Sequence, residues 1–170
     1  MANHTLKDAF IDELRDMLGA EKQLLKALPR LAKKASEPKL RAAFTGHLEE
    51  TKGQIARLEK IFDALDTKAR GTRCAGMAGI LEELDEVLAH GHDDATRDAR
   101  LIAAAQRVEH YEMAVYGTLI AWGKVLDYPK VVSLLEQTLK QENGADKTLT
   151  GLAEDGINES AADGLRNLVD

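Results

Sequence analysis

Several side chains that can bind metal ions lie where the spacing of apolar residues predicts the buried face of a helix. Glu21, for example, falls on the same predicted face as Leu14 and Leu24. Burying even one unpaired carboxylate costs several kcal/mol, and no Lys or Arg falls at the same heights on these faces. The candidate ligands found in this way are Glu21, His47, Glu50, Gln54, Glu109, Glu112, Glu142 and Asp146.

The candidate acids would repel one another strongly unless they were protonated or bound to cations. Carboxylates with an occasional imidazole form the ligand set expected for iron or manganese. One acid from each of two helices, with paired ligands from two others, is the arrangement of di-metal carboxylate proteins. We therefore predict two metal ions as cofactors, iron with manganese as the alternative. The competing interpretation places individual acids at the edge of each face, where they reach solvent or pair with Arg from a neighbouring helix.

The elements that must position these residues are predicted to be helices. Only 4% of the residues are aromatic, and the chain is rich in Ala, Leu, Lys, Glu and Asp, which favours helix over strand. Helical spacing of apolar residues runs through residues 5–35, 38–65, 94–126 and 129–152, with a crossover at 67–79 and a shorter amphipathic stretch at 80–89.

This pattern predicts an all-α fold, a ferritin-like four-helix bundle of two antiparallel helical hairpins joined by a long crossover with a short extra helix. An offset of 91 residues pairs Glu21 with Glu112 and Leu48 with Leu139, which indicates a duplicated hairpin. We predict a single domain over residues 1–170, in which residues 153–170 form a flexible tail or one further helical turn.

Composition and charge narrow the function classes. The 170 residues include 23 Lys and Arg against 29 Asp and Glu, and the net charge of −6 disfavours nucleic acid as a partner. Cys74 is the single cysteine, which excludes an intramolecular disulfide and a four-thiolate metal site. No apolar stretch approaches the ~20 residues of a membrane span, and the first residues lack a signal-peptide pattern. We therefore expect a cytoplasmic protein without membrane or nucleic-acid partners.

Several runs of residues resemble one bacterial family closely. They are Asp12-Glu13-Leu14-Arg15-Asp16, Ala20-Glu21-Lys22-Gln23-Leu24, His47-Leu48-Glu49-Glu50-Thr51, Arg73-Cys74-Ala75-Gly76-Met77, residues 99–106, Val108-Glu109-His110-Tyr111-Glu112 and Tyr116-Gly117-Thr118-Leu119. Over about residues 6–152 the chain is similar to the YciE/YciF family of bacterial ferritin-like stress proteins. The resemblance implies a ferritin-like four-helix fold, a homodimer and a di-iron site, in a family without a settled biochemical activity.

A wider resemblance to rubrerythrin-like proteins concerns the ligands. Their third bundle helix carries Glu-x-x-Glu, which Glu109 and Glu112 match. Their fourth carries Glu followed one turn later by His, where this chain has Asp146 after Glu142. Their second helix usually carries Glu-x-x-His, but the corresponding position here is Gly53. These departures imply a site richer in oxygen ligands, with a different ligand set on the second helix.

Together these observations predict a di-metal protein of the stress response that reacts with peroxide or dioxygen, or that oxidises Fe(II). Glu50 and either Glu109 or Glu112 are candidates to bridge the ions. The candidates to hold individual ions are Glu21, Gln54, Glu142 and Asp146, with His47 as a ligand or as a donor to a ligand. Two alternatives stay open, a structural or binding protein with a static metal or none, and iron storage in a cage. The sequence assigns no catalytic residue and leaves open whether the protein is an enzyme.

Overall fold

The computed structural model describes residues 5–166, and every regular element in this range is a helix. The elements are α1 (Leu6–Lys34), α2 (Pro38–Ala64), α3 (Ala75–Ala89), α4 (Asp94–Val125), α5 (Pro129–Leu152), the π-helical turn η1 (Ala153–Ile157) and α6 (Asn158–Arg166). The predicted all-α class is therefore confirmed for the described residues. The bounds of the long helices α1, α2, α4 and α5 lie within one residue of those predicted.

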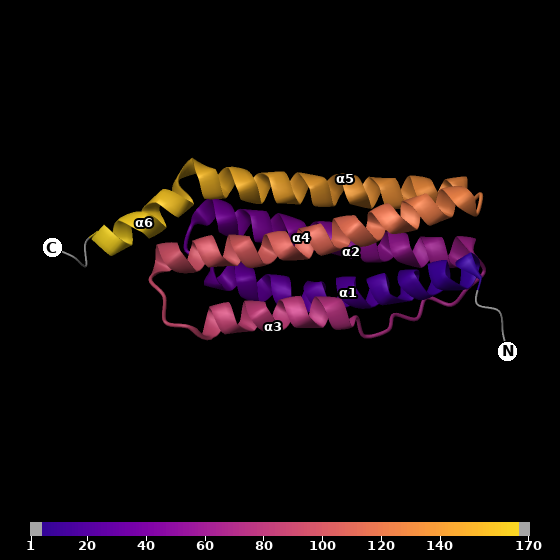
Figure 1. The fold of residues 1–170 in the computed structure, drawn as a ribbon, viewed down its shortest axis with the longest axis horizontal. Coiled ribbons are helices and arrows are strands. Elements are labelled where there is room, and N and C mark those ends of the chain that lie inside the picture. The colour runs from indigo at the N-terminus through magenta and orange to yellow at the C-terminus, as the bar shows by residue number, and fades with distance from the viewer. Residues whose placement is uncertain (1–4, 167–170) are drawn as a thin grey trace.

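The four long helices lie side by side along the long axis of the molecule (Figure 1). Consecutive helices α1 and α2 pack together, as do α4 and α5, and α1 also contacts α4 while α2 contacts α5. These contacts enclose a common core between the two pairs. The shorter α3 packs outside these four helices, against α1 and α4. The connection before it runs from the end of α2 to the start of α3 (Figure 1).

Local hydrogen bonds and prolines explain where the long helices begin. At the start of α1, the Thr5 hydroxyl accepts from the Asp8 backbone N–H while the Asp8 carboxylate accepts from the Thr5 backbone, which forms a capping box. Asp93 caps α4 by accepting from the backbone N–H of Thr96 at 2.9 Å. Proline occupies the first turn of α2 and of α5, where a missing N–H is tolerated.

Helix α3 begins at Ala75, five residues before the predicted stretch. The Cys74 sulfur caps it by accepting from the Met77 backbone N–H at 3.3 Å. The Gln23 side chain of α1 holds both backbone groups of Cys74, at 2.8 Å and 3.1 Å. Sequence spacing missed this turn because a thiol is an unusual cap and because glycines interrupt the apolar pattern.

The connection into α3 passes so close to α1 that it requires a glycine. The Thr72 backbone N–H donates to the Arg15 carbonyl at 3.0 Å. A Cβ atom at Gly19 would lie 1.6 Å from the Thr72 carbonyl oxygen, a separation that no side chain tolerates. Gly19 therefore lets the connection lie directly on α1 and so fixes where α3 packs.

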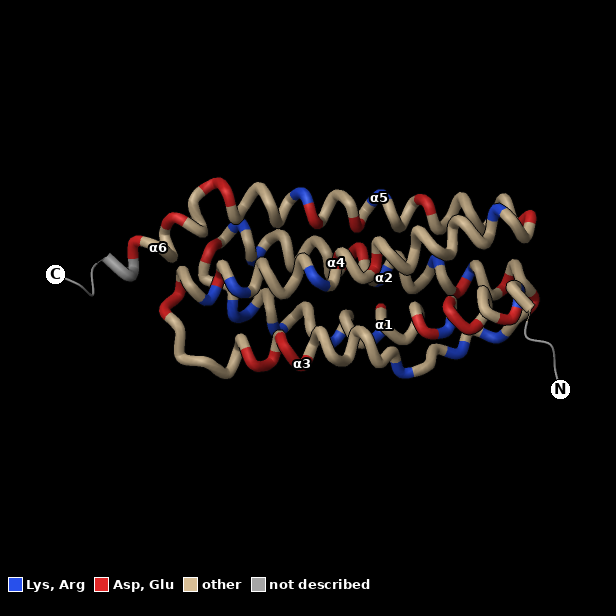
Figure 2. Tube along the Cα trace, in the orientation of Figure 1, with Lys and Arg blue, Asp and Glu red and all other residues tan. Residues whose placement is uncertain are grey.

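Charged residues hold α3 at its edges. Figure 2 shows acidic positions but no basic ones on α3, whereas both signs occur along α1 and α4. Asp85 pairs with Arg30 of α1 at 2.6 Å, and Glu83 approaches Arg107 of α4 at 3.7 Å. All four side chains are exposed, so these pairs orient α3 and contribute little to stability.

Beyond α5 the backbone leaves helical values at Asp155 and Gly156 and then forms α6, so helix extends further than the single turn expected. Gly156 has a φ of 124°, a value that favours glycine, and the helix axis changes direction there into α6 (Figure 1). Ile157 is buried, which anchors this region, and α6 also contacts α4. The predicted flexible tail is thus helical up to Arg166, and residues 167–170 lie outside the described part of the chain.

The core consists mainly of Leu, Ile, Ala and aromatic side chains from all of the long helices, together with Met77, Leu84 and Val87 of α3. Across residues 5–166, no helix is both long and apolar enough to cross a lipid bilayer. Near the middle of the long helices, buried polar residues interrupt this apolar core.

Candidate metal centre

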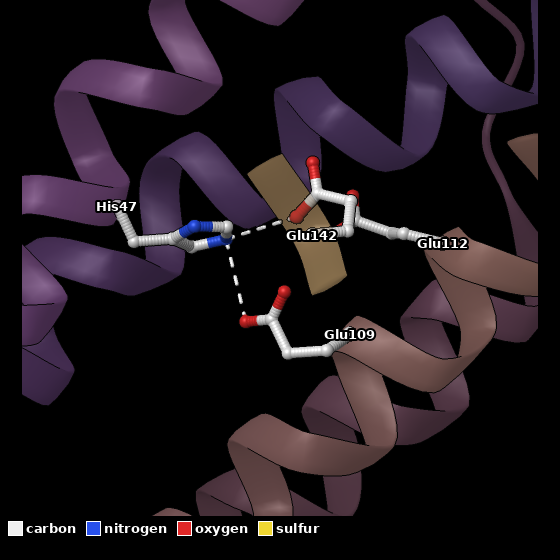
Figure 3. A group of neighbouring side chains, drawn as sticks. All are labelled: His47, Glu109, Glu112 and Glu142. Carbon is white, nitrogen blue, oxygen red and sulfur yellow. Dashed lines mark ion pairs between the residues drawn. The ribbon is translucent and has the colours of Figure 1, made fainter. Parts of the chain in front are cut away.

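Four buried side chains converge between the long helices. His47 comes from α2, Glu109 and Glu112 come from α4, and Glu142 comes from α5 (Figure 3). One ligand atom from each of the four lies within 4.8 Å of every other. The imidazole nitrogen Nε2 of His47 lies 3.5 Å from Glu109 Oε1 and 4.0 Å from Glu142 Oε2. One cation could be held by all four residues, because oxygen and nitrogen donors converge on a single position.

Two more of the predicted residues adjoin this group and are also buried. The Gln54 amide of α2 donates a short hydrogen bond to Glu142 Oε1. The Glu21 carboxylate of α1 accepts from the Tyr116 hydroxyl of α4 at 2.5 Å. All four long helices therefore contribute polar groups to the same region. Gln54 and Tyr116 each fix the orientation of one carboxylate, as the neighbours of metal ligands commonly do.

Burial and mutual repulsion perturb these acids strongly. Removal from water, reinforced by the charge of Glu142, raises the pKa of Glu21 to about 8. Burial likewise raises the pKa of Glu109 to about 8 and that of Glu142 to about 9. Burial, with the charges of Glu21, Glu142 and Glu109, raises the pKa of Glu112 well above its ordinary value. The fold thus places carboxyl groups where none of them can ionise easily alone.

The same acids act in the opposite direction on the imidazole. Burial works to lower the pKa of His47, but Glu50, Glu142 and Glu21 together outweigh it, and the net pKa is raised. The positive charge on the ring would offset part of the negative charge of the cluster. One imidazolium cannot balance several carboxylates, so a larger positive charge is needed to ionise the whole group.

Unpartnered polar atoms give an independent sign that the cluster fits a metal. Buried polar atoms in native proteins nearly always have hydrogen-bond partners. Among the described residues, the buried side-chain atoms without a hydrogen-bond partner are Glu21 Oε2, His47 Nδ1 and Nε2, Gln54 Oε1, Glu109 Oε2, Glu112 Oε1 and Oε2, and Glu142 Oε2. Every one belongs to the predicted ligand set. Their chemistry fits iron or manganese, which bind carboxylate oxygen and imidazole nitrogen.

The structure places the two remaining predicted residues at the edge of the cluster. The Glu50 side chain is 41% exposed, and its Oε2 lies 3.6 Å from His47 Nδ1. The Asp146 side chain is 20% exposed, accepts from Gln106 at 3.2 Å and pairs with His110 at 3.2 Å. Neither contributes to the compact group of four, although the charge of Asp146 helps to raise the pKa of Glu109.

Sequence reasoning missed Arg57, a residue of α2 whose positive charge acts on the site. Its positive charge lowers the pKa of Glu21, although burial leaves the net shift upward. Its guanidinium donates to Thr138 at 2.6 Å and to Gln141 at 2.7 Å, both on α5, and so pairs with none of the buried acids. Arg57 lies one turn beyond Gln54 on α2 and could have been noticed in the sequence. Where its side chain points, however, depends on how α2 packs against α5.

Comparison with known proteins identifies the family. Residues 5–162 match the family described as a domain of unknown function (DUF892). The chain belongs to the DUF892 family. Among its DUF892 relatives, Protein YciF of Escherichia coli strain K12 is 45% identical over 158 residues, which cover 92% of this chain and 95% of YciF.

Solved structures show the same fold for this DUF892 chain. The crystal structure of the E. coli stress protein YciF matches it with a TM-score of 0.87, over 91% of this chain and 98% of that one. YcfI of Rhodopseudomonas palustris, provisionally described as a structural protein, is 39% identical with a TM-score of 0.85, over 88% and 97% of the two chains. A Xanthomonas campestris protein of 19% identity, with a TM-score of 0.76 over 95% and 99%, shares the fold.

Proposed function

We propose that this DUF892 protein is a ferritin-like four-helix bundle that holds two metal ions, iron with manganese as the alternative, and acts in a stress response. The observation that carries the proposal is the set of buried, unpartnered ligand atoms contributed by every long helix. A native core rarely leaves so many polar atoms without partners, and bound ions or ordered water satisfy those that remain. The description of YciF as a stress protein supports the cellular role.

In this proposal His47, Glu109, Glu112 and Glu142 bind metal directly. Glu21 and Gln54 supply the further ligands that the second metal ion needs. Glu50 and Asp146 lie at the edge and would join after a change of side-chain rotamer. Two adjacent Fe(II) ions held there would supply the electrons that reduce peroxide or dioxygen and would be oxidised to Fe(III) in doing so.

The chain's own residues prepare the site. Tyr116 orients Glu21 and Gln54 orients Glu142, so two of the carboxylates are held in place before any ligand arrives. Burial and the charges of Glu21, Glu142 and Glu109 raise the pKa of Glu112 well above its ordinary value, which favours its protonated form. Loss of that proton to solvent accompanies metal binding, which makes metal affinity rise with pH. The partly exposed Glu50 links the buried His47 to solvent and marks the side from which small molecules enter.

The test is anaerobic reconstitution with Fe(II), followed by addition of hydrogen peroxide while the optical spectrum and peroxide consumption are recorded. Repeated consumption of peroxide by the wild-type chain is the expected result. The double variant Glu112→Ala, Glu142→Ala should consume none. The variant Glu49→Ala, Glu136→Ala, which removes two exposed acids of α2 and α5 that lie outside the cluster, is the control. Iron bound without turnover would favour a ferroxidase or storage role, and absence of bound iron would refute the proposal.

A second candidate function is a structural or binding protein with a static metal. The description of YcfI as a structural protein favours it, and so does Gly53 at the position where rubrerythrin-like proteins carry His. We further propose a homodimer in the cytoplasm, without nucleic-acid partners. A dimer by light scattering would argue against a storage cage, because a hollow cage needs many subunits.

A further inference from the structure

An elongated cavity of about 610 Å³ leads away from the acid cluster between the helices. His47 and Glu109 line one end of it. From there its α1 wall runs from Leu24 to Leu31, and seven residues of helix span about 10 Å. The α2 and α5 walls extend in the same direction, toward the end of the molecule that carries α6 (Figure 1). A cavity of this volume lies within the range of small-molecule sites.

Apolar side chains form most of the walls beyond the polar end. They come from α1, α2, α3, α4 and α5 and include Leu28, Phe44, Leu84, Ala105, Val108 and Leu149. Such walls favour an alkyl chain over a polar or charged molecule, because burial of apolar surface is the main gain available there.

Small residues leave the cavity open to solvent between α2 and α5. Gly46 of α2 and Gly144 of α5 both line it, and both are exposed. A Cβ atom added at either glycine would meet nothing within 4 Å. An entrance at this position needs no local unfolding, and larger side chains there can narrow it without displacing the helices.

The polar end determines which head group fits. His47 and Glu109 are buried there, and both ring nitrogens of His47 and Oε2 of Glu109 lack hydrogen-bond partners, so one His47 nitrogen stays available when the other binds metal. Glu50 lines the cavity with a negative charge and the exposed Lys140 with a positive one, so a head group of either sign would meet a like charge. A metal-loaded centre would in turn repel a cationic one. A head group that is uncharged and carries an oxygen, such as a hydroxyl or an aldehyde, avoids both penalties and can hydrogen-bond.

We propose that this cavity binds an elongated, uncharged amphiphile, with its alkyl chain along the apolar walls and its oxygen-bearing head at His47 and Glu109. The orientation of the head rests on the proposed metal centre, whereas binding of the alkyl chain rests on the cavity alone. The class of ligand is a medium-chain alcohol or aldehyde.

The experiment is calorimetric titration of the full chain with 1-decanol, in metal-free and Mn(II)-loaded protein, with bound metal counted in the same samples. Saturable binding near one molecule per chain is expected in both. Gly144→Leu should weaken binding by at least about tenfold, because it fills the entrance. Gly151→Leu is the matched control, since Gly151 is also on α5, has open space and does not line the cavity. Gly46→Leu tests the opposite wall should Gly144→Leu fail to fold.

The outcomes separate this inference from the proposed metal function. Bound Mn(II) without saturable decanol binding would overturn the cavity proposal and leave the metal centre standing. Decanol binding without bound metal would support the alkyl site and refute the metal centre. Equal affinities of Gly144→Leu and Gly151→Leu would overturn the assigned site. In Mn(II)-loaded protein, decanoate and decylamine should each bind at least about tenfold more weakly than decanol, and tighter binding of either would overturn the uncharged head.

Discussion

Two buried carboxylates of α4, Asp98 and Glu112, differ in their hydrogen bonding. Asp98 is 2% exposed and accepts from the backbone N–H groups of Ser36 and Glu37, at 2.7–3.1 Å, where α1 passes into α2. Glu112 is fully buried, and neither of its oxygens has a hydrogen-bond partner. Of these two buried acids on one helix, Asp98 is therefore satisfied by the junction of α1 and α2, and Glu112 has no hydrogen-bond partner.

This contrast distinguishes a buried acid that stabilises the fold from a buried acid that needs a ligand. An acid that accepts backbone hydrogen bonds stabilises the junction it caps. An acid held without partners destabilises the metal-free fold and persists only where another ligand satisfies it. Tyr111 gives a second example of the satisfied kind, because its hydroxyl lies 3.0 Å from the Cys74 sulfur and 3.3 Å from Asp16.

The largest expected effect is on the pH dependence of metal-free stability. The pKa values of Glu21, Glu109 and Glu142 rise from 4.5 to about 8, 8 and 9 in the folded state. Protonation therefore stabilises the fold, fully below about pH 4.5 and progressively less as pH rises through 8 to 9. Each titrating group changes the free energy of unfolding by up to about 1.4 kcal/mol per pH unit. Urea unfolding with chelator at pH 5, 7 and 9 measures this fall, and a constant free energy would contradict it.

Removing the satisfied acid should be strongly destabilising. Asp98→Ala removes the buried acceptor of the backbone N–H groups of the half-buried Ser36 and Glu37, which should cost about 3 kcal/mol. Thermal or urea unfolding measures the loss. Asp12→Ala, in an exposed pair with Arg15, is the control and should change stability little. Equal effects of the two substitutions on the free energy of unfolding would contradict the claim that Asp98 stabilises the fold through its hydrogen bonds.

Removing the unsatisfied acid should have the opposite sign. Glu112→Gln should stabilise the metal-free protein by about 1–2 kcal/mol at pH 7, because Gln needs no proton to be neutral in the folded state. At pH 4.5 the stabilisation should shrink, since the carboxyl is then about half protonated in the unfolded state as well, and folding takes up less proton. Urea unfolding at the two pH values tests this. Destabilisation of the metal-free protein at pH 7 would mean that Glu112 is structural.

The smallest expected effect concerns the second satisfied group. Tyr111→Phe removes the hydroxyl that contacts the Cys74 sulfur and Asp16 and should cost about 1 kcal/mol. The aromatic ring, which packs against Gly76, is retained. Urea unfolding supplies the free energy, and metal binding measured in parallel should be unchanged. A loss of bound metal in this variant would show that the two regions are coupled.

Much of the fold could be predicted because the long helices carry strong local signals. Thr5, Asp93 and the prolines of the first turns mark the starts, and the apolar spacing covers whole helices. The first turn of α3 and the helix α6 were not predicted. The former depends on contacts of Cys74 with Gln23, and the latter on the bend at Gly156, so neither has a signature in helical spacing.

The site was predictable as a set of residues and less so as a geometry. Helical phase identified Glu21, Gln54, Glu112 and the others because a carboxylate among core positions stands out in sequence. Phase alone could not separate the compact group from the edge residues Glu50 and Asp146, since a small rotation of a helix moves a side chain from centre to rim. The apolar cavity depends on the volumes left between five helices, which no spacing rule supplies.

The central claim is that the unpartnered acids hold metal, and metal counting tests it most directly. Equilibrium dialysis against Mn(II), with elemental analysis, should give two ions per wild-type chain. The double variant Glu112→Gln, Glu142→Gln keeps the size of both side chains and should retain none under the same conditions. Asp98→Asn, which alters the satisfied acid of the same helix, should still bind two. Absence of metal from the wild-type chain, or two ions retained by the double variant, would contradict the account.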